Sequence, residues 1–316
     1  MSAVTTPVDP LATSPEAVTK GRQANLWRDT LGSILRQRSA VAGLLILGVL
    51  VFMSVFAPLI APFDPDQSLL GVEEGVLKRS APCIHVLGCP ADKPQHIFGT
   101  DGNFRDVFSR VLYGGRISLT IGFAAVGFAI VIGTVIGAIA GYVGGTPDNG
   151  LMRLMDVVLA FPSLLLAITI VVALGQSYVN ALVAISIVSI PVYARLVRSS
   201  VLSAREADYV TASRALGESP TGILVRRIMP NAITPLIVQG TLGIGGAVLE
   251  IAALSFVGVV GLGAAEWGSM IAFERNQLFS APHVILLPGL AIVLAVLAFN
   301  LLGDGLRDAL DPRLNR

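Results

Sequence analysis

Long uncharged stretches alternate with short charged ones along this chain. Residues 40–63 and residues 117–147 contain no charged side chain, and the whole stretch between Asp156 and Arg195 is also uncharged. The hydrocarbon core of a bilayer, about 30 Å thick, is crossed by about 20 apolar residues of α-helix. The pattern therefore predicts a first membrane span at 40–63 and a second within 117–147.

The stretch between Asp156 and Arg195 is too long for one span, since as a single helix it would reach about 57 Å at 1.5 Å per residue. The turn-forming residues Gly175, Ser177 and Asn180 divide it into two. Prolines within or near the spans are expected to kink them. The remaining spans are predicted at 153–174, 179–198, 232–258 and 284–303, with kinks at Pro162, Pro191 and Pro235. The pattern predicts an all-α membrane protein with six transmembrane helices.

Small residues recur at every fourth position of the second span. In lipid, helices associate by close van der Waals approach, and a stripe of small side chains allows two backbones to touch. We therefore expect a helix–helix seam here, with the partner helix either in the same chain or in a second subunit. The stripe consists of Ala125, Ala129, Gly133, Gly137 and Gly141.

Composition agrees with a membrane protein. The 316 residues are 53% hydrophobic and 14% charged, whereas soluble domains carry about 25% charged residues. A net charge of +1 gives no field that would attract nucleic acid. Residues 1–38 lack the apolar core of a cleavable signal, so the first span is expected to be retained.

Basic residues indicate the orientation. They gather before the first span, between the fourth and fifth spans, and after the sixth, which places both termini in the cytoplasm by the positive-inside rule. An interfacial helix at 24–38, or else a plain tail, precedes the first span. The predicted organisation is a cytoplasmic tail at 1–39, a first span at 40–63, an extracytoplasmic loop at 64–116, a core of five spans at 117–303 that includes a cytoplasmic loop at 199–231, and a cytoplasmic tail at 304–316.

The most unusual segment is the charged stretch from Glu206 to Asn231, which lies between two apolar spans. Gly217 can end a helix in a left-handed cap. Ser219 and Pro220 form an N-cap and first-turn pair that starts a second short helix, which Pro230 is expected to stop. We predict a helix–turn–helix that projects from the membrane toward a partner, with a simple solvated connector as the alternative.

Two carboxylates, Asp156 and Glu250, lie nearest the apolar phase. An ionisable residue within a membrane suggests a functional site, and the alternative is an interfacial or water-cavity carboxylate. No series of acids crosses the spans, which disfavours a proton-coupled carrier.

The cysteines Cys83 and Cys89 both fall in the predicted outer loop, where a disulfide is permitted. So short a closed loop would stabilise the fold by roughly 2 kcal/mol. A metal site with His85 and His96 is the alternative, although the spacing fits no standard zinc pattern. Gly144 and Gly145 lack the Lys-Ser/Thr of a phosphate loop, so we expect no ATP hydrolysis, catalytic residue or cofactor in this chain.

Several motifs resemble one family. Gly217 followed by Pro230-Asn231 resembles the EAA loop of ABC-importer permeases, and the sequence from Tyr209 to Gly217 is similar to that of the peptide/nickel branch. Only Ala212 matches the EAA triplet, and Arg227 and Met229 also depart from the general motif. Further likeness to C-type dipeptide/oligopeptide permeases is carried by Phe98–Asp101, Gly115–Leu119, Leu254–Phe256, Pro288–Ala291 and Asn300–Asp308, with Phe104 where the family usually has glycine.

The resemblance implies the type I ABC-importer permease fold and a subunit that imports di- or oligopeptides across a bacterial cell membrane. Its implied partners are a homologous second permease, two cytoplasmic ATPases that bind ATP and Mg²⁺, and an extracytoplasmic substrate-binding protein. The resemblance also implies which residues couple to the ATPases: Glu206, Tyr209, Val210, Ala212, Arg214, Ala215, Leu216, Gly217, Glu218 and Pro230. The apolar ones expected to pack into an ATPase groove are Val210, Ala212, Ala215 and Leu216. The charged ones expected to contact the rim of that groove are Glu206, Arg214 and Glu218.

Three alternatives remain open from the sequence. Within the family, nickel or another small solute could replace peptide as the substrate. A stand-alone secondary carrier would show acids or broken helices in two symmetric halves, and a non-transporting scaffold would need no ATPase. Only the permease hypothesis predicts that a soluble ATPase co-purifies in fixed stoichiometry.

Overall fold

The computed structural model describes residues 37–90, 92–261 and 263–310, and in these residues the regular structure is helical, with two isolated β-bridges and no strand. The spanning part consists of α2 (Arg38–Val55), α3 (Ala57–Ile60), α4 (Val107–Val143), α5 (Gly145–Leu159), α6 (Ser163–Leu174), α7 (Tyr178–Arg205), α10 (Met229–Val257) and α12 (His283–Leu310). The connecting helices are α8 (Asp208–Ala215), α9 (Pro220–Gly222), a π-helical turn (Ile223–Ile228), α11 (Trp267–Glu274) and two 3₁₀ turns at His85–Leu87 and Arg275–Gln277.

Five of the described helices are long and apolar enough to cross a membrane, and the bent pair α5–α6 brings the number to six. The expectation of an all-α membrane protein is confirmed, and the expected number of six spans is reached if the bent pair counts as one span. The predicted interfacial helix at 24–38 lies almost wholly outside the described residues, as does the end of the C-terminal tail.

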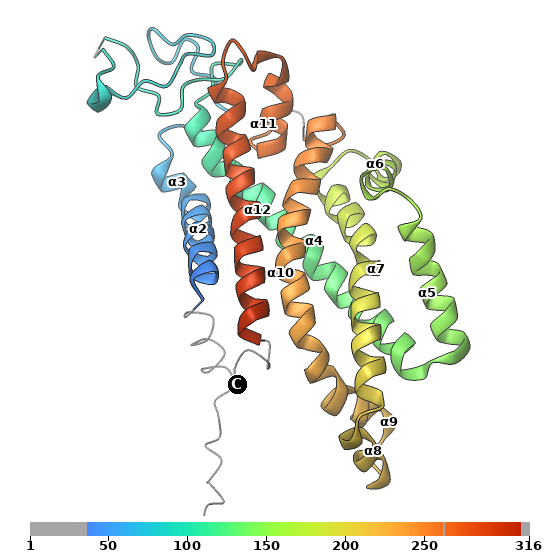
Figure 1. Ribbon diagram of the computed structural model, residues 1–316. Helices are drawn as coiled ribbons and strands as arrows, with labels where there is room; N and C mark the ends of the chain where they lie inside the picture. The colour runs from blue at the N-terminus through green and yellow to red at the C-terminus, as the bar shows by residue number, and fades with distance from the viewer. Residues whose placement is uncertain (1–36, 91, 262, 311–316) are drawn as a thin grey trace, which may run out of the picture.

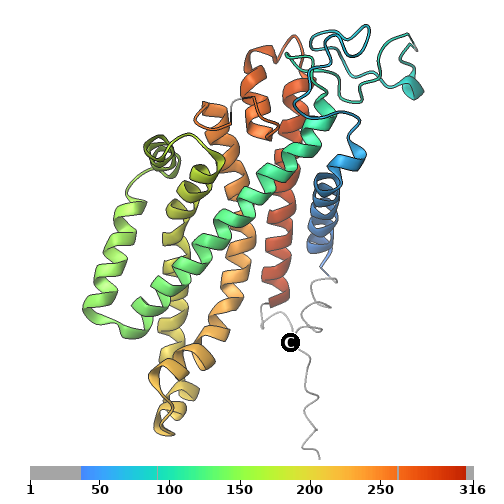
Figure 2. The same ribbon diagram turned by 180° about the vertical axis from the view of Figure 1, so that it is seen from behind.

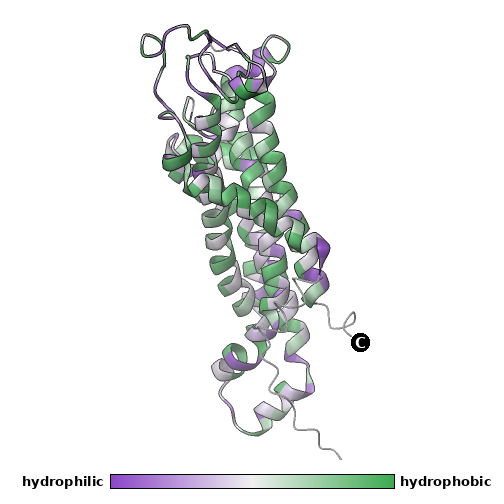
Figure 3. Ribbon diagram, turned by 90° about the vertical axis from the view of Figure 1, so that its left-hand side faces the viewer, coloured by the Kyte–Doolittle hydropathy of each residue, from purple (hydrophilic) through white to green (hydrophobic). Residues whose placement is uncertain are grey.

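The helices form an elongated bundle (Figures 1 and 2) in which α4 runs diagonally across the others. The long loop, residues 61–106, lies at one end with α11, and α8 and α9 protrude at the opposite end. We call these the loop end and the elbow end. Hydrophobic residues predominate along the middle of the bundle (Figure 3), as the apolar stretches of the sequence require.

The expected third span, 153–174, is wrong as a single helix. Residues 145–174 form two helices, α5 and α6, that bend by 90° at the break between Leu159 and Ser163. Pro162 occupies this break, where it lacks an N–H and biases Phe161 away from the helical region. The turn that follows α6 agrees with the prediction, because Gly175 has a φ of +104° and the side chain of Asn180 donates to the carbonyls of Leu174 and Gly175.

Two other boundaries differ from the expected ones. Helix α4 begins at Val107, well before residue 117, because the Asp106 side chain caps it by accepting from the Ser109 backbone N–H at 2.7 Å. The predicted 40–63 span is divided at Phe56 into α2 and α3, and Pro58 stands in the first turn of α3.

The small-residue stripe of α4 packs against α7 of the same chain. All five of its members are buried. A Cβ added to Gly133 would lie 2.7 Å from Tyr193 Cβ, and one added to Gly141 would lie 2.9 Å from the Arg198 carbonyl oxygen. Larger side chains at these positions would separate the two helices, which places the seam within the chain rather than between subunits.

Candidate functional site

The predicted helix–turn–helix is a sharp elbow at one end of the bundle. We use this name for residues 206–228, which connect α7 to α10 (Figure 1). Helix α8 spans Asp208–Ala215. It ends in a Schellman motif, since the Gly217 N–H donates to the Arg214 carbonyl at 3.0 Å and the Glu218 N–H donates to the Ser213 carbonyl at 3.1 Å. Gly217 has a φ of +79°, in the left-handed region that glycine adopts without strain.

The second half of the elbow starts at Ser219 and Pro220, as the sequence predicts, but does not stop at Pro230. The Ser219 hydroxyl accepts from the Gly222 N–H at 3.2 Å, with Pro220 in the first turn. Pro230, however, does not end a helix. It lies in the first turn of α10, directly after the π-helical turn, and the chain stays helical from Pro220 to Val257.

The elbow is held to the bundle by an apolar contact of its own. Val210, Ile223 and Ile228 are at most 1% exposed and belong to the main hydrophobic core. The expectation that Val210 packs into a partner's groove is therefore wrong, because its side chain is already buried inside this chain. Its burial fixes α8 against the turn that leads into α10.

Polar contacts reinforce the same arrangement. The Arg227 guanidinium donates to the Glu218 carboxylate at 3.0 Å, and the Asn231 side-chain amide donates to the Tyr209 hydroxyl at 3.0 Å. Glu218, which the sequence suggested as a rim contact, is thus paired within the chain. The Asn231–Tyr209 pair joins α8 to α10, and the Arg227–Glu218 pair joins the two halves of the elbow.

What remains free on the elbow is an exposed face around its tip, which we call the elbow face. Leu216 is 88% exposed, which places it among the most exposed large apolar side chains of the described residues. The elbow face consists of exposed residues, with the exposed Glu206 beside it: Tyr209, Ala212, Arg214, Ala215, Leu216 and Gly217. The arrangement offers a partner an apolar knob with charges around it.

The carboxylates near the apolar phase differ in their surroundings. Asp156 on α5 accepts from Arg195 on α7 at 2.6 Å, and Asp148 accepts two bonds from Arg198, the longer at 2.7 Å. These pairs fasten α5 to α7. Glu250 on α10 has no such partner among the described residues, and it lines a cavity of about 170 Å³ between α7 and α10.

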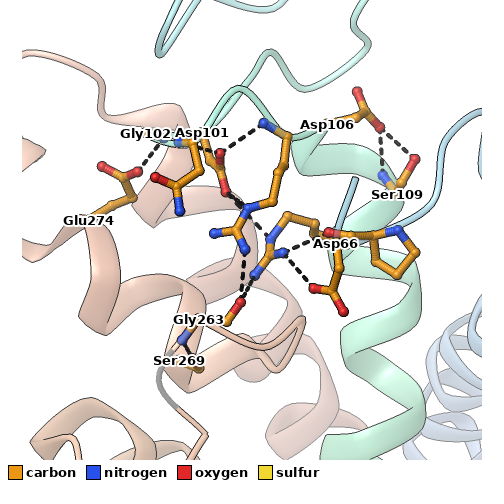
Figure 4. Close-up of polar contacts among 12 residues, drawn as sticks. Asp66, Asp101, Gly102, Asp106, Ser109, Gly263, Ser269 and Glu274 are labelled. Atoms are coloured by element: carbon orange, nitrogen blue, oxygen red, sulfur yellow. Dashed lines mark hydrogen bonds and ion pairs between the residues drawn. The ribbon is translucent and has the colours of Figure 1, made fainter. Parts of the chain in front are cut away.

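A buried polar cluster, which the sequence did not suggest as a unit, closes the loop end (Figure 4). The Asp101 carboxylate accepts from the side chain of Arg105 at 2.7 Å and lies 3.6 Å from that of Arg110. Both arginines also donate to the Gly263 carbonyl, at 2.9 and 3.0 Å. These contacts join the start of α4 to the segment between α10 and α11.

Two more buried acids extend this cluster onto α11. Glu274 accepts from the Gly102 N–H and, at 2.8 Å, from Arg79. Glu266 caps α11 by accepting from the backbone of Ser269 at 2.8 Å, and it also accepts from the Ser118 hydroxyl of α4 at 3.0 Å. The charged motif before the second span therefore has a structural role, and its signal in the sequence was only its density of Asp and Arg.

Cys83 and Cys89 form a disulfide in the long loop, so their thiolates are not available as metal ligands. His96 is buried and lies 3.1 Å from the Asp106 carboxylate, whereas the His85 ring contacts the Lys93 carbonyl at 2.8 Å. No cluster of three metal-ligating side chains occurs among the residues that the structure describes.

Comparison with known proteins gives a consistent result. Residues 133–316 match the family described as "Binding-protein-dependent transport system inner membrane component", and residues 25–78 match the "N-terminal TM domain of oligopeptide transport permease C". Among solved structures, the MetNI methionine ABC transporter in an inward-facing conformation covers 64% of this chain and 96% of its own, with a TM-score of 0.53 at 21% identity. The likeness to MetNI supports an ABC-transporter permease fold.

Curated relatives resemble the chain along most of its length. The dipeptide transport system permease protein DppC of Alkalihalophilus pseudofirmus is 43% identical over 91% of this chain and 90% of its own. The di/tripeptide permease DppC of Pseudomonas aeruginosa is 40% identical over 96% of both chains. The glutathione permease GsiD of Pectobacterium atrosepticum is 40% identical over 91% of both.

Proposed function

Since the chain belongs to the family of binding-protein-dependent transport system inner membrane components, we propose that it is the C-type permease subunit of an ATP-driven importer of short peptides. The observation that supports this most directly is the exposed elbow at the end of a bundle that has no ATP-binding motif of its own. Peptide is favoured over nickel because the relatives above are named for dipeptides, di- and tripeptides and glutathione.

The elbow face is where force from a partner ATPase enters. Leu216 fills an apolar recess of the ATPase, and Glu206 and Arg214 contact the rim of that recess. Because the burial of Val210 in the core and the Tyr209–Asn231 hydrogen bond fix the elbow to the bundle and to α10, displacement of the elbow moves α10 with it. Alternating access follows from that movement, as the spans rock against those of a homologous second permease.

This assignment fixes the orientation of the chain. The elbow end, and with it both termini, faces the cytoplasm, where the arginines of 195–227 satisfy the positive-inside rule. The loop end faces the outside, where the disulfide is stable and a substrate-binding protein delivers peptide. ATP and Mg²⁺ are bound by the partner ATPases.

Reconstitution of the whole importer tests the function. Proteoliposomes that contain both permeases, both ATPases and the binding protein should take up labelled dipeptide when ATP is present on the cytoplasmic side. Hexapeptide and Ni²⁺ are measured in parallel. Uptake of Ni²⁺ without peptide, or uptake by this subunit alone without nucleotide, would overturn the proposal.

Leu216→Asp tests the site. A charge in an apolar recess is costly, so this variant should reach the membrane but lose co-purification with the ATPases and at least 90% of ATP-driven uptake, by the order of magnitude of hot-spot losses, roughly 2 kcal/mol or more. The control is Val86→Asp, which changes an equally exposed apolar residue in the long loop. Undiminished ATPase binding by Leu216→Asp would contradict the role of the elbow face.

A further inference from the structure

The cavity between α7 and α10 has a composition that lipid-facing surfaces do not have. It is lined by the polar side chains Ser189, Tyr193, Gln239 and Glu250, together with small residues and Val192. Ionisable and amide side chains within a membrane are costly, and they face the bundle interior or water-filled space. The cavity is therefore part of a wet region of the molecule.

The α10 side of the cavity is one continuous stripe. Gln239, Gly243, Gly246 and Glu250 are spaced by four, three and four residues, which places them on one face of the helix. Gly246 has open space beside it, and the Tyr193 hydroxyl lies so close to Gly243 that a Cβ there would collide with it. The stripe thus has a polar group at each end, with the Tyr193 hydroxyl beside Gly243 and open space beside Gly246.

Glu250 is the only ionisable residue of the cavity besides the tyrosine. It makes no ion pair or hydrogen bond with the described residues, in contrast to Asp156 and Asp148, which are paired with Arg195 and Arg198. It lies seven residues before the end of α10, about 10 Å along the axis. An unpaired carboxylate at this depth is suited to a cationic ligand that arrives from the loop end.

We propose that this cavity is a binding site for the substrate in transit, in which the Glu250 carboxylate pairs with the ammonium group at the amino terminus of the peptide. The inference rests on the proposed function and adds a site within the membrane. The Tyr193 hydroxyl and the Gln239 amide are positioned to hydrogen-bond to peptide groups. A transition metal fits less well, because the cavity offers one carboxylate and no imidazole or thiolate.

Binding to the permeases alone tests the site, since the binding protein has its own preferences. The complex of both permeases and both ATPases, in nanodiscs and without the binding protein, is titrated with labelled dipeptide, with and without a non-hydrolysable ATP analogue. Unlabelled dipeptide and its C-terminal amide should compete, and the N-acetylated dipeptide should not. Equal competition by the N-acetylated peptide overturns the proposal without any variant.

Glu250→Gln should weaken dipeptide binding by roughly tenfold or more, the usual effect of losing a charged hydrogen-bond partner, and should remove the discrimination against the N-acetylated peptide. Glu250→Asp, which keeps the charge, should retain part of both. Asp308→Asn is the control, because it removes one exposed carboxylate at the other end of the bundle. Wild-type affinity and discrimination in Glu250→Gln would overturn the site.

Cysteine labelling tests access to the same stripe. The only two cysteines of the chain are joined in a disulfide, so Gly246→Cys introduces a single free thiol. A membrane-impermeant thiol reagent should label it, and dipeptide should slow the labelling, whereas Leu249→Cys, on the neighbouring exposed face, should react slowly and without protection. No labelling at 246, or no protection, overturns the proposal.

The two proposals fail in different ways. A reconstituted importer that takes up no peptide refutes the proposed function. An importer that takes up peptide with ATP, but whose Glu250→Gln form binds and transports at wild-type levels, refutes only the site in the cavity.

Discussion

Gly217 determines the direction in which the chain leaves α8. Its φ of +79° is one that a side chain with a branched β-carbon avoids. No heavy atom lies within 4 Å of the place where a Cβ would stand, so a substitution would be resisted by the backbone and not by crowding. The residue is therefore a test of backbone geometry alone.

Gly217→Val should separate ATP hydrolysis from uptake. The left-handed conformation costs a non-glycine residue about 1–2 kcal/mol, which the elbow relieves by turning away from its docked position, while the membrane spans are untouched. Uptake per ATP hydrolysed in proteoliposomes is the measurement, with Gly48→Ala, in open space on α2, as the control. Unchanged uptake in Gly217→Val would count against coupling through the elbow.

Phe104 is the converse case at the residue scale. Phenylalanine stands here where the resembling permeases usually have glycine, and Phe104 has a φ of +60°. The turn therefore has the left-handed backbone that glycine favours, although the residue there is phenylalanine. The Asp101 carboxylate holds it by accepting from the Asn103 and Arg105 backbone N–H groups, at 2.7 and 2.9 Å.

At the scale of elements, the close approach of α4 and α7 depends on the absence of side chains. Gly137 leaves no space for even a Cβ against the Ala194 carbonyl. Gly127, on the same helix, has nothing within 4 Å of the corresponding point. The same substitution at Gly137 and at Gly127 therefore compares a crowded position of α4 with an open one.

Gly137→Leu should prevent α4 from closing on α7 and lower stability by more than the 1–3 kcal/mol or so that is typical of overpacking, since backbone atoms are the obstacle. Gly127→Leu should be nearly neutral. The yield of the folded importer by size-exclusion chromatography in detergent, together with its thermal midpoint, measures the difference. Equal behaviour of the two variants would show that the seam is not a tight contact.

Some features of the helices could be predicted from the sequence, and others could not. The positions of the spans followed from runs of uncharged residues, and the cap at Gly217 and the turn at Gly175 followed from residue chemistry. The 90° bend at Pro162 did not follow, because a proline that kinks one helix and a proline that separates two leave the same local pattern. The burial of Val210 could not be foreseen either, since it depends on Ile223 and Ile228 folding back over α8.

At the scale of the whole molecule, the buried cluster at the loop end joins segments that are far apart in the sequence. Asp101 is 5% exposed, and its carboxylate balances two arginines. Removing one member of a buried charged group costs about 3–5 kcal/mol, because the remaining charges are left without compensation. Rigidity at this end therefore depends on a few side chains.

Asp101→Asn should lower the thermal midpoint of the purified importer by several degrees and loosen the contact between α4 and α11. Asp92→Asn, which removes an exposed carboxylate from the long loop, should have no effect. Thermal unfolding followed by tryptophan fluorescence suits this test, since Trp267 donates to the Val111 carbonyl at the same interface. An unchanged midpoint would mean that the cluster is not stabilising.

The unbroken helical path from Pro220 to Val257 makes α10 a lever. The 38 residues of this path extend about 57 Å at 1.5 Å per residue, and the second half of the elbow, from Pro220 to Ile228, forms its short arm. A tilt of roughly 10° about its lower third would shift the far arm by about 6 Å or more, by the geometry of a rod of that length. Such a shift exceeds the width of a water molecule, so under the proposed function a small stroke delivered at the elbow is enough to open or shut a passage at the opposite surface.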